Sequence, residues 1–200
     1  MGPDFSSVTE LPGQLATREQ LARLYHRYHL VTDYSHERRV LEVACGAGVG
    51  LGYLARKARL VIGGDYTWTN VMKAQQFYQG RVGVLGLDAQ ALPFPPASFD
   101  TVVMFEGIYY LPAPERFVTE CRRIVAPAGV VLISSANKDW PDFIPSRHAV
   151  RYLSATELHD LLSAGGFTVE MYGAFPTMPH SLSGKVISHV RRVATALHLV

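Results

Sequence analysis

Short apolar runs alternate with segments of helical periodicity along most of the chain. The apolar runs predict strands over Val40–Cys45, Leu60–Gly64, Val82–Leu87, Phe99–Phe105, Gly129–Ser135 and Phe167–Tyr172. The segments between them predict helices over Val49–Lys57, Thr69–Tyr78, Ala113–Val125 and Ala155–Ala164. Such alternation is typical of βαβ units, in which a parallel sheet has helices on both faces. With right-handed crossovers, the simplest α/β fold is a doubly wound, mostly parallel sheet.

The two ends of the chain fit this pattern less well. Residues 1–17 are polar and include Pro3 and Pro12, which predicts a loose leader. Residues 18–34 carry apolar side chains at helical spacing and predict an amphipathic helix. Gly184–Leu199 predicts a further helix with basic residues on one side. A final antiparallel strand is expected after it, but the chain ends first, so either the sheet lacks this strand or the sequence is truncated.

Composition narrows the class of protein. The chain has 200 residues, which suits a single domain over 18–200, and its 48% hydrophobic and 18% charged residues are typical of a folded core. The net charge of +2 and the short, scattered arginine pairs favour no nucleic-acid partner. Two cysteines do not suggest a disulfide framework, and the sequence shows neither a membrane-spanning apolar run nor a signal peptide pattern. A cytoplasmic protein is therefore expected.

Three glycines, Gly46, Gly48 and Gly50, follow the first apolar run and precede a helix. Glycine allows a sharp turn and lets a ligand approach the backbone closely, and a helix N-terminus favours a negative group. Two ligands suit such a loop: the pyrophosphate of a dinucleotide, and the aminoacyl end of S-adenosylmethionine (SAM). A tight strand-to-helix turn that binds nothing is the third possibility.

The register of the glycines and one acid distinguish these ligands. The dinucleotide fingerprint Gly-x-Gly-x-x-Gly needs a glycine at position 51, which is Leu51 here. Glu42 lies inside the strand before the loop, where burial of a carboxylate costs free energy unless it is hydrogen-bonded. The ammonium group of a ligand, bound directly or through water, would account for this acid.

The segment Glu42–Gly50 resembles motif I of class I SAM-dependent methyltransferases, in the form Glu-x-Ala-Cys-Gly-x-Gly-x-Gly. Ala44 replaces the usual first glycine of that motif. The resemblance implies a Rossmann-like sheet, SAM as the cofactor and S-adenosylhomocysteine (SAH) as the product. Within the motif, the residues that it assigns to the cofactor site are Glu42, Ala44, Cys45, Gly46 and Gly48.

Two further acids follow the second and third apolar runs. Asp65 lies 23 residues after Glu42, and Asp88 lies 23 residues after Asp65. Because the carboxyl ends of neighbouring parallel strands share one edge of a sheet, these acids should face one ligand. Asp65 can accept from both ribose hydroxyls and Asp88 from the adenine amine, while Ala89 offers a backbone N–H to the ring and Tyr66 can cover it. The resemblance assigns the same roles to the two acids; helix capping is the alternative for each alone.

The approach to the fourth apolar run extends the resemblance over roughly residues 25–175. Leu92-Pro93-Phe94, followed by Phe99-Asp100, looks like the loop and strand start of small-molecule methyltransferases of the type 11-like branch. Glu120–Gly129 resembles their Glu-x-x-Arg-x-Leu-x-Pro-Gly-Gly turn, with Ala128 for one glycine.

The end of the fourth run should lie under the sulfonium of SAM, where carbonyls and aromatic faces favour a positive sulfur. Phe105 and Glu106 are therefore predicted to contact the cofactor. Glu106 would orient the SAM amino group or a substrate hydroxyl, and a surface acid or helix cap is the alternative. Of the adjacent Tyr109 and Tyr110, one should pack into the core, and Tyr110 is preferred as the one that faces the site.

Tyr25–His29 lies on the predicted N-terminal helix, where some relatives carry His-Arg-Tyr on a helix that closes over the SAM carboxylate. Arg27 suits a carboxylate through its planar fork, and Tyr28 could add a hydroxyl donor. The alternative is a helix that only covers the sheet. His26 and His29 have only Asp33 as a possible third ligand, so no metal site is expected.

The sequence leaves the methyl acceptor open. Phe105–Ile108 stands where many amino-nitrogen methyltransferases of nucleic acids or proteins carry Asn/Asp-Pro-Pro-Tyr/Phe, which favours a small-molecule acceptor with an oxygen, carbon or nitrogen nucleophile. Candidate bases are Glu106, Tyr110 and His29. The aromatic segment 137–152 (Trp140, Phe143) predicts a substrate lid, with an ordinary surface connection as the alternative. An NAD(P)-dependent oxidoreductase and a non-catalytic SAM-binding protein remain as competing functions.

Overall fold

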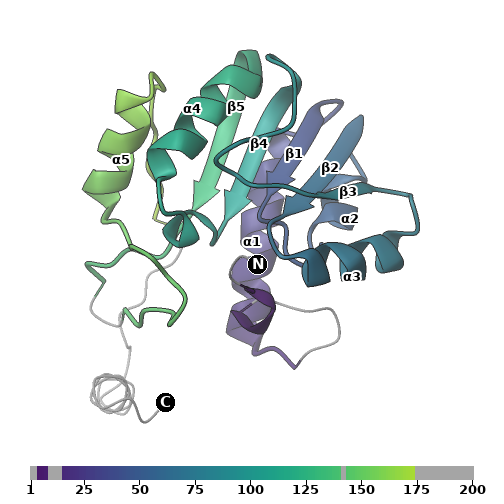
Figure 1. Ribbon diagram of the computed structural model, residues 1–200, viewed down its shortest axis with the longest axis horizontal. Coiled ribbons are helices and arrows are strands. Elements are labelled where there is room, and N and C mark those ends of the chain that lie inside the picture. The colour runs from purple at the N-terminus through teal and green to yellow at the C-terminus, as the bar shows by residue number, and fades with distance from the viewer. Residues whose placement is uncertain (1–3, 9–14, 141–142, 174–200) are drawn as a thin grey trace.

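A computed structural model of the protein describes residues 4–8, 15–140 and 143–173, which form a parallel sheet with helices on both faces (Figure 1). Five strands lie in the order β3-β2-β1-β4-β5, and all neighbours are parallel. The strands are β1 (Arg39–Val43), β2 (Leu60–Asp65), β3 (Gly83–Gly86), β4 (Phe99–Phe105) and β5 (Val125–Ser134). The strand order reverses between β1 and β4, where doubly wound sheets bind their ligands. The predicted fold class is confirmed.

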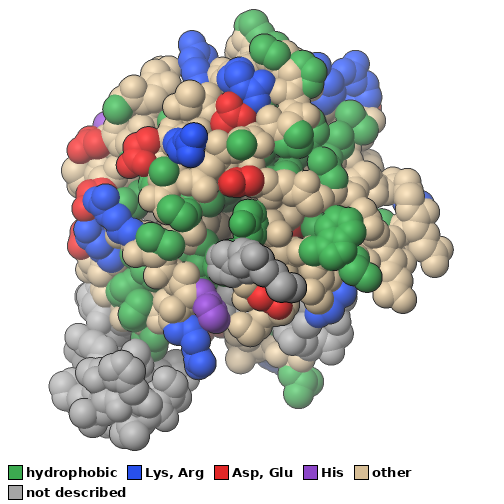
Figure 2. Space-filling model, viewed as in Figure 1, with side chains coloured by type: hydrophobic (Ala, Val, Ile, Leu, Met, Phe, Trp, Pro, Cys, Tyr) green, Lys and Arg blue, Asp and Glu red, His purple; other side chains and the backbone are tan. Residues whose placement is uncertain are grey.

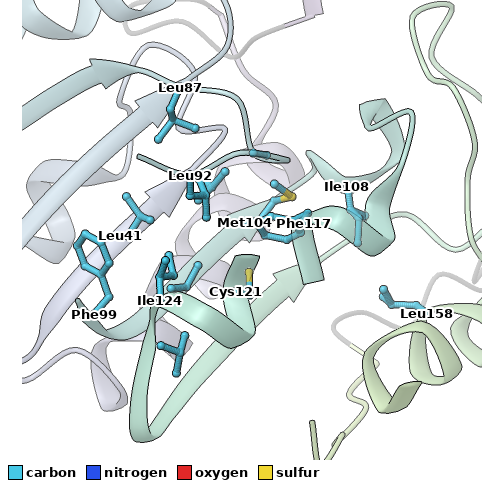
Figure 3. Close-up of a cluster of buried hydrophobic side chains, with 14 of the residues drawn as sticks. Leu41, Leu87, Leu92, Phe99, Met104, Ile108, Phe117, Cys121, Ile124 and Leu158 are labelled. Carbon is cyan, nitrogen blue, oxygen red and sulfur yellow. The ribbon is translucent and has the colours of Figure 1, made fainter. Parts of the chain in front are cut away.

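The helices divide between the two faces of the sheet. They are α1 (Arg18–Asp33), α2 (Leu51–Leu54), α3 (Trp68–Tyr78), α4 (Pro114–Ile124) and α5 (Ala155–Ala164), with the short 3-10 helices η1 (Ser6–Val8) and η2 (Ile108–Tyr110). One buried cluster joins Leu41 and Met104 of the sheet to Phe117 of α4 and Leu158 of α5 (Figure 3). The other packs α1, α2 and α3 on the opposite face through Val31, Val40, Leu51, Val61, Val71 and Val103.

β1 places an acid inside one of these layers. Alternate residues of a strand point to opposite faces, so Leu41 and Val43 join the cluster under α4, while Val40 joins the cluster under α1. Glu42 shares the face of Val40 by the same period. It also lies in the central strand, between Gly63 of β2 and Val103 of β4. The sequence therefore buries a carboxylate at the centre of the sheet.

The prediction of a sixth strand over Phe167–Tyr172 is wrong. The segment has the alternating burial of a strand, with Phe167 and Val169 half-buried and Thr168 exposed. It pairs with no strand among the described residues. Phe167 packs instead against α4, where the Arg122 guanidinium lies 5.9 Å from the centre of its ring. Alternation records which side chains are buried, whereas a strand also needs a hydrogen-bonded neighbour.

Other predicted elements differ at their boundaries. The helix predicted over Val49–Lys57 is regular only over α2 and continues as turns, since Gly50 and Gly52 weaken its first turn. β5 begins at Val125, four residues before the predicted start. The helix predicted over Gly184–Leu199 lies outside the described residues.

Two alanines stand at backbone conformations that favour glycine. Ala44 has φ 58° and Ala128 has φ 61°, both in the left-handed region. That region costs a residue with a Cβ about 1 kcal/mol or more. These are the two positions where the resemblance expects glycine, so the turns keep their shape although the residue differs.

Candidate functional site

A cavity of about 520 Å³ lies where β1, β2, β3 and β4 end, within the size range of small-molecule sites. The predicted site residues that line it are Arg27, Tyr28, Glu42, Ala44, Cys45, Gly46, Asp65, Tyr66, Asp88, Ala89, Phe105, Glu106 and Tyr110. Two others, Gly48 and His29, are outside the lining. The three strand-end acids thus meet around one cavity.

Glu42 is the most buried acid of the cavity wall, with 2% of its surface exposed. The Tyr28 hydroxyl donates to its Oε1, whereas no donor among the described residues reaches Oε2. Burial raises the pKa of Glu42 from 4.5 to about 7, against the opposing effects of the Tyr28 hydrogen bond and the Arg27 charge. A buried carboxylate oxygen without a partner is costly. A cationic ligand in the cavity would supply that partner.

Tyr28 reaches Glu42 because position 50 has no side chain. A Cβ on Gly50 would lie 1.7 Å from Cζ of Tyr28. The Tyr28 ring also packs edge-on against Phe105, with ring centroids 5.2 Å apart. Burial, reinforced by the charge of Glu42, raises the pKa of the Tyr28 phenol, so Tyr28 remains a proton donor. The third glycine of the loop therefore makes room for an aromatic ring.

Asp65 connects the end of β2 to the glycine loop. Its Oδ2 accepts from the Gly46 N–H at 2.8 Å, and its Oδ1 accepts from the Thr67 N–H at 2.8 Å. Burial raises the pKa of Asp65, and these two hydrogen bonds oppose the rise. A carboxylate offers about four acceptor positions. Asp65 thus holds the loop and keeps acceptor capacity for the cavity that it lines.

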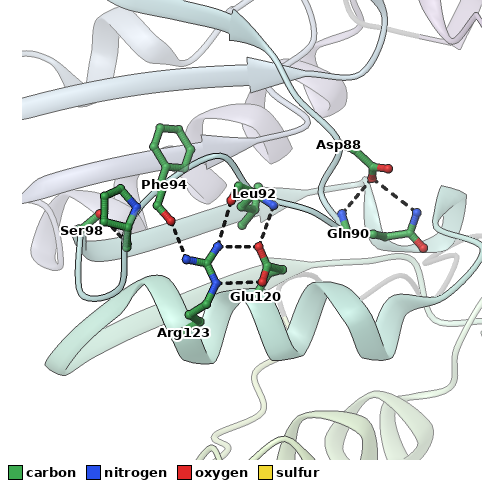
Figure 4. Close-up of polar contacts among 8 residues, drawn as sticks. Asp88, Gln90, Leu92, Phe94, Ser98, Glu120 and Arg123 are labelled. Carbon is green, nitrogen blue, oxygen red and sulfur yellow. Dashed lines mark hydrogen bonds and ion pairs between the residues drawn. The ribbon is translucent and has the colours of Figure 1, made fainter.

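Asp88 lies after β3, in a loop that α4 fastens. Its Oδ1 accepts from the backbone and side-chain amides of Gln90, at 2.8 and 3.4 Å (Figure 4). Arg123 donates to the carbonyl oxygens of Leu92 (2.9 Å) and Phe94 (2.5 Å). Glu120 pairs with Arg123 and accepts from the Leu92 N–H at 2.7 Å. The Glu-x-x-Arg pattern therefore holds the loop that carries Asp88.

Arg27 and Glu106 form an ion pair in the cavity wall, with Nη1 and Oε1 3.3 Å apart. The guanidinium of Arg27 also lies 5.9 Å from the centre of the Phe105 ring. Oε1 of Glu106 accepts from the Ser134 hydroxyl at 2.8 Å, and Oε2 accepts from the Tyr109 hydroxyl at 3.3 Å. Both oxygens of Glu106 thus have protein donors, and Oε1 also faces Arg27.

The tyrosines of the adjacent pair differ in burial, but both line the cavity, so the predicted division between core and site is only partial. Tyr109 is 8% exposed and stacks on Tyr152, with centroids 4.3 Å apart. Tyr110 is less buried and packs against Phe5, with centroids 4.9 Å apart. Both rings line the cavity.

Gly48 and His29 have other surroundings. The carbonyl of Gly48 accepts from the Tyr78 hydroxyl at 2.6 Å, and its φ of 80° forms the turn of the loop. His29 is exposed, stacks on Tyr25 and lies 3.4 Å from the Tyr53 hydroxyl. In the described ranges no three His, Cys, Asp or Glu side chains form a metal-binding group.

Phe5 and His148 are among the lining residues that the sequence did not predict. The described part of the predicted loose leader packs on the domain: the Phe5 N–H donates to Thr67 Oγ1 at 3.1 Å, and Ser7 Oγ lies 3.3 Å from His148 Nε2. These partners are 62 and 141 positions apart in the chain. Periodicity and local motifs carry no signal for such contacts.

Among its described residues, the predicted lid reaches the cavity through its second half. His148 and Val150 line the cavity, whereas Trp140 and Phe143 do not. Trp140 lies beside Arg23, and Phe143 packs against Tyr152 with centroids 4.6 Å apart. The two aromatic residues that suggested the lid thus contact neighbouring residues of the protein outside the cavity lining.

Known proteins resemble this chain in sequence and in fold. Residues 41–133 match a family model described as a methyltransferase domain. A probable SAM-dependent methyltransferase of Mycolicibacterium smegmatis is 40% identical over 139 residues, which cover 66% of this chain and 53% of that protein. A fatty-acid O-methyltransferase of the same species is 37% identical over 120 residues, covering 57% and 42% of the two chains. The crystal structure of a SAM-dependent methyltransferase from Aquifex aeolicus has the same fold, with a TM-score of 0.66 at 23% identity over 78% of this chain and 86% of that one.

The chain is thus similar to SAM-dependent methyltransferases, in sequence over residues 41–133 and in fold. It spans about half the length of the curated relatives it matches. None of the helices in the described ranges combines the length and apolarity that a membrane span requires.

Proposed function

We propose that the chain transfers the methyl group of SAM to a small-molecule acceptor with an oxygen, carbon or nitrogen nucleophile, and releases SAH. The observation that carries the proposal is the buried Oε2 of Glu42, which has no donor within the part of the chain that the structure describes and belongs to a cavity that Asp65 and Asp88 also line. The ammonium group of SAM would donate a hydrogen bond to this oxygen.

The cavity residues suit SAM along its length. Glu42 would accept from its ammonium group, and Arg27 would bind its carboxylate through a planar fork. Asp65 would accept from the ribose hydroxyls. Asp88 and the Ala89 N–H would bind the adenine edge, and the exposed ring of Tyr66 would cover the adenine face.

SAM supplies an activated methyl group on a positive sulfur. The contribution of the protein is to hold both reactants aligned and to exclude water. The aromatic side chains of Phe105, Tyr109 and Tyr110 line the β4 side of the cavity and suit that task. We propose that segment 137–152 completes the enclosure as a substrate lid, through His148 and Val150.

Several observations support a small-molecule acceptor. The fatty-acid O-methyltransferase relative is named for a small molecule, and Phe105–Ile108 replaces the motif of many nucleic-acid and protein methyltransferases. Acidic and basic side chains are interspersed on the face shown in Figure 2, without one broad basic patch.

Both cysteines are buried thiols, which supports the expected cytoplasmic location.

A screen for SAH formation tests the proposal. The purified chain is incubated with SAM and a panel of long-chain fatty acids, phenols and aliphatic alcohols, and SAH is quantified against an acceptor-free control. We expect at least one acceptor to raise SAH formation, and Asp65→Asn to reduce it more than the surface variant Asp160→Asn does. Binding of SAH without turnover on any acceptor would favour the non-catalytic alternative. Binding of NAD without SAH would favour the oxidoreductase.

A further inference from the structure

One imidazole lies in the cavity wall among the described residues, that of His148. Imidazole is the side chain best suited to take up and release a proton near neutral pH. His148 comes from the segment between β5 and α5, and nothing in the cofactor site requires it. Its position therefore bears on the acceptor.

The structure holds His148 on the β4 side of the crevice. The N–H groups of Val150 and Arg151 donate to the Tyr109 carbonyl at 2.9 and 3.2 Å. The Tyr110 hydroxyl donates to Ser146 Oγ at 3.3 Å. These bonds tie the segment to η2, which follows β4, whereas Asp65 and Asp88 follow β2 and β3. His148 thus comes from a segment that is bonded to η2.

A hydroxyl already approaches the ring nitrogen of His148. Nε2 lies 3.3 Å from the Ser7 hydroxyl, and the Phe5 ring packs edge-on against the imidazole at 6.4 Å. The carboxyl group of Asp4 also faces His148. Its pKa is lowered first by hydrogen bonds from Ser6 and further by the charges of Lys73 and His148. An acceptor hydroxyl that replaced the Ser7 hydroxyl would therefore meet Nε2 next to an apolar ring.

Of the other acids of the cavity, Glu42, Asp65 and Asp88 belong to the proposed cofactor site. Glu42 accepts from Tyr28, and Asp65 accepts from backbone N–H groups. Both oxygens of Glu106 have donors. Burial raises the pKa of Tyr109 far above its ordinary value, so its phenol stays protonated and cannot take up a proton.

We propose that His148 is the catalytic base for a neutral hydroxyl acceptor on an apolar body, with a phenol as the simplest case. The inference rests on the proposed function.

Nε2 of His148 takes the hydroxyl proton while the oxygen forms its bond to the methyl carbon. The carbon–sulfur bond breaks, and its electron pair stays on sulfur. The products are a methyl ether, SAH and an imidazolium that returns its proton to water. A carboxylic acid is already ionised at neutral pH and needs no base, so His148 favours a hydroxyl acceptor over a fatty acid.

The probe for this assignment is 4-nitrophenol, whose phenol and phenolate forms absorb at different wavelengths. Its ionisation is titrated in the SAH complexes of the wild type, His148→Gln and the exposed control His159→Gln. We expect the apparent pKa of the bound probe to be at least one unit higher in His148→Gln than in the other two proteins. In turnover with the best hydroxyl acceptor, kcat should fall about 100-fold or more while KM for SAM stays within about twofold. Free imidazole should restore part of the activity of His148→Ala.

Equal probe ionisation in the three proteins would overturn the assignment. So would a wild type that binds SAH but not 4-nitrophenol, because the cavity would then exclude phenols. A wild type that does not bind SAH would refute the proposed function itself.

Discussion

Glu42→Gln should stabilise the ligand-free protein and weaken its cofactor binding. Glutamine keeps the shape of Glu42 and can still accept from Tyr28, but it carries no charge into the buried site. Burial raises the pKa of Glu42 from 4.5 to about 7, so ionisation is disfavoured in the folded state relative to the unfolded state. The wild type therefore loses stability as the pH rises from about 4.5 through about 7, and the variant does not share this loss.

The magnitude follows from the pKa values. At about 1.4 kcal/mol per pH unit, the raised pKa costs the wild type about 3 kcal/mol at pH 8 and about 1 kcal/mol at pH 5. Urea unfolding of both proteins from pH 5 to pH 8 measures the difference in the free energy of unfolding. Asp65, whose pKa is also raised, is common to both proteins and cancels in this difference.

The ligand should reverse the order of stability. Loss of a charge-assisted hydrogen bond to the SAM ammonium costs about 1.5–3 kcal/mol, so the affinity of Glu42→Gln for SAH should fall at least about tenfold. A Glu42→Gln variant no more stable than the wild type at pH 8 would contradict this prediction. So would an unchanged SAH affinity.

Three further predictions concern the framework of the site. Gly50→Ala should lower the free energy of unfolding by about 1–3 kcal/mol and weaken SAH binding, because the new methyl group would lie 1.7 Å from Cζ of Tyr28; unchanged urea unfolding would contradict this. Ala128→Gly should raise the free energy of unfolding by up to about 1 kcal/mol, because φ of 61° disfavours a Cβ, and a loss of stability would count against it. Arg39 lowers the pKa of Asp100 to about 2, so Asp100→Asn should cost about 2 kcal/mol at pH 7. That cost, followed by urea unfolding, should shrink as the pH falls from about 4 to about 2, and a constant cost would show that the ion pair is not its source.

The sequence predicted the parts of the site that local chemistry controls. Glu42, Asp65 and Asp88 could be placed together because parallel strands bring their carboxyl ends to one edge. The glycine register also pointed away from a dinucleotide, and Leu51 at the decisive position is fully buried in the core under α1.

The remaining features depend on contacts that no local pattern contains. Phe5 and His148 reach the cavity through contacts between segments far apart in the chain. Gly50 was read as part of a ligand loop, but its tightest constraint is the Tyr28 ring of a different helix. The strand predicted over Phe167–Tyr172 failed for the same reason, since alternating burial does not specify a pairing partner.

Calorimetric titration of the wild-type chain with SAH and, separately, with NAD distinguishes the two cofactors. We expect SAH to bind at one site per chain, with an affinity that falls in Glu42→Gln and in Asp65→Asn, and we expect NAD not to bind. Binding of NAD without binding of SAH would contradict both expectations.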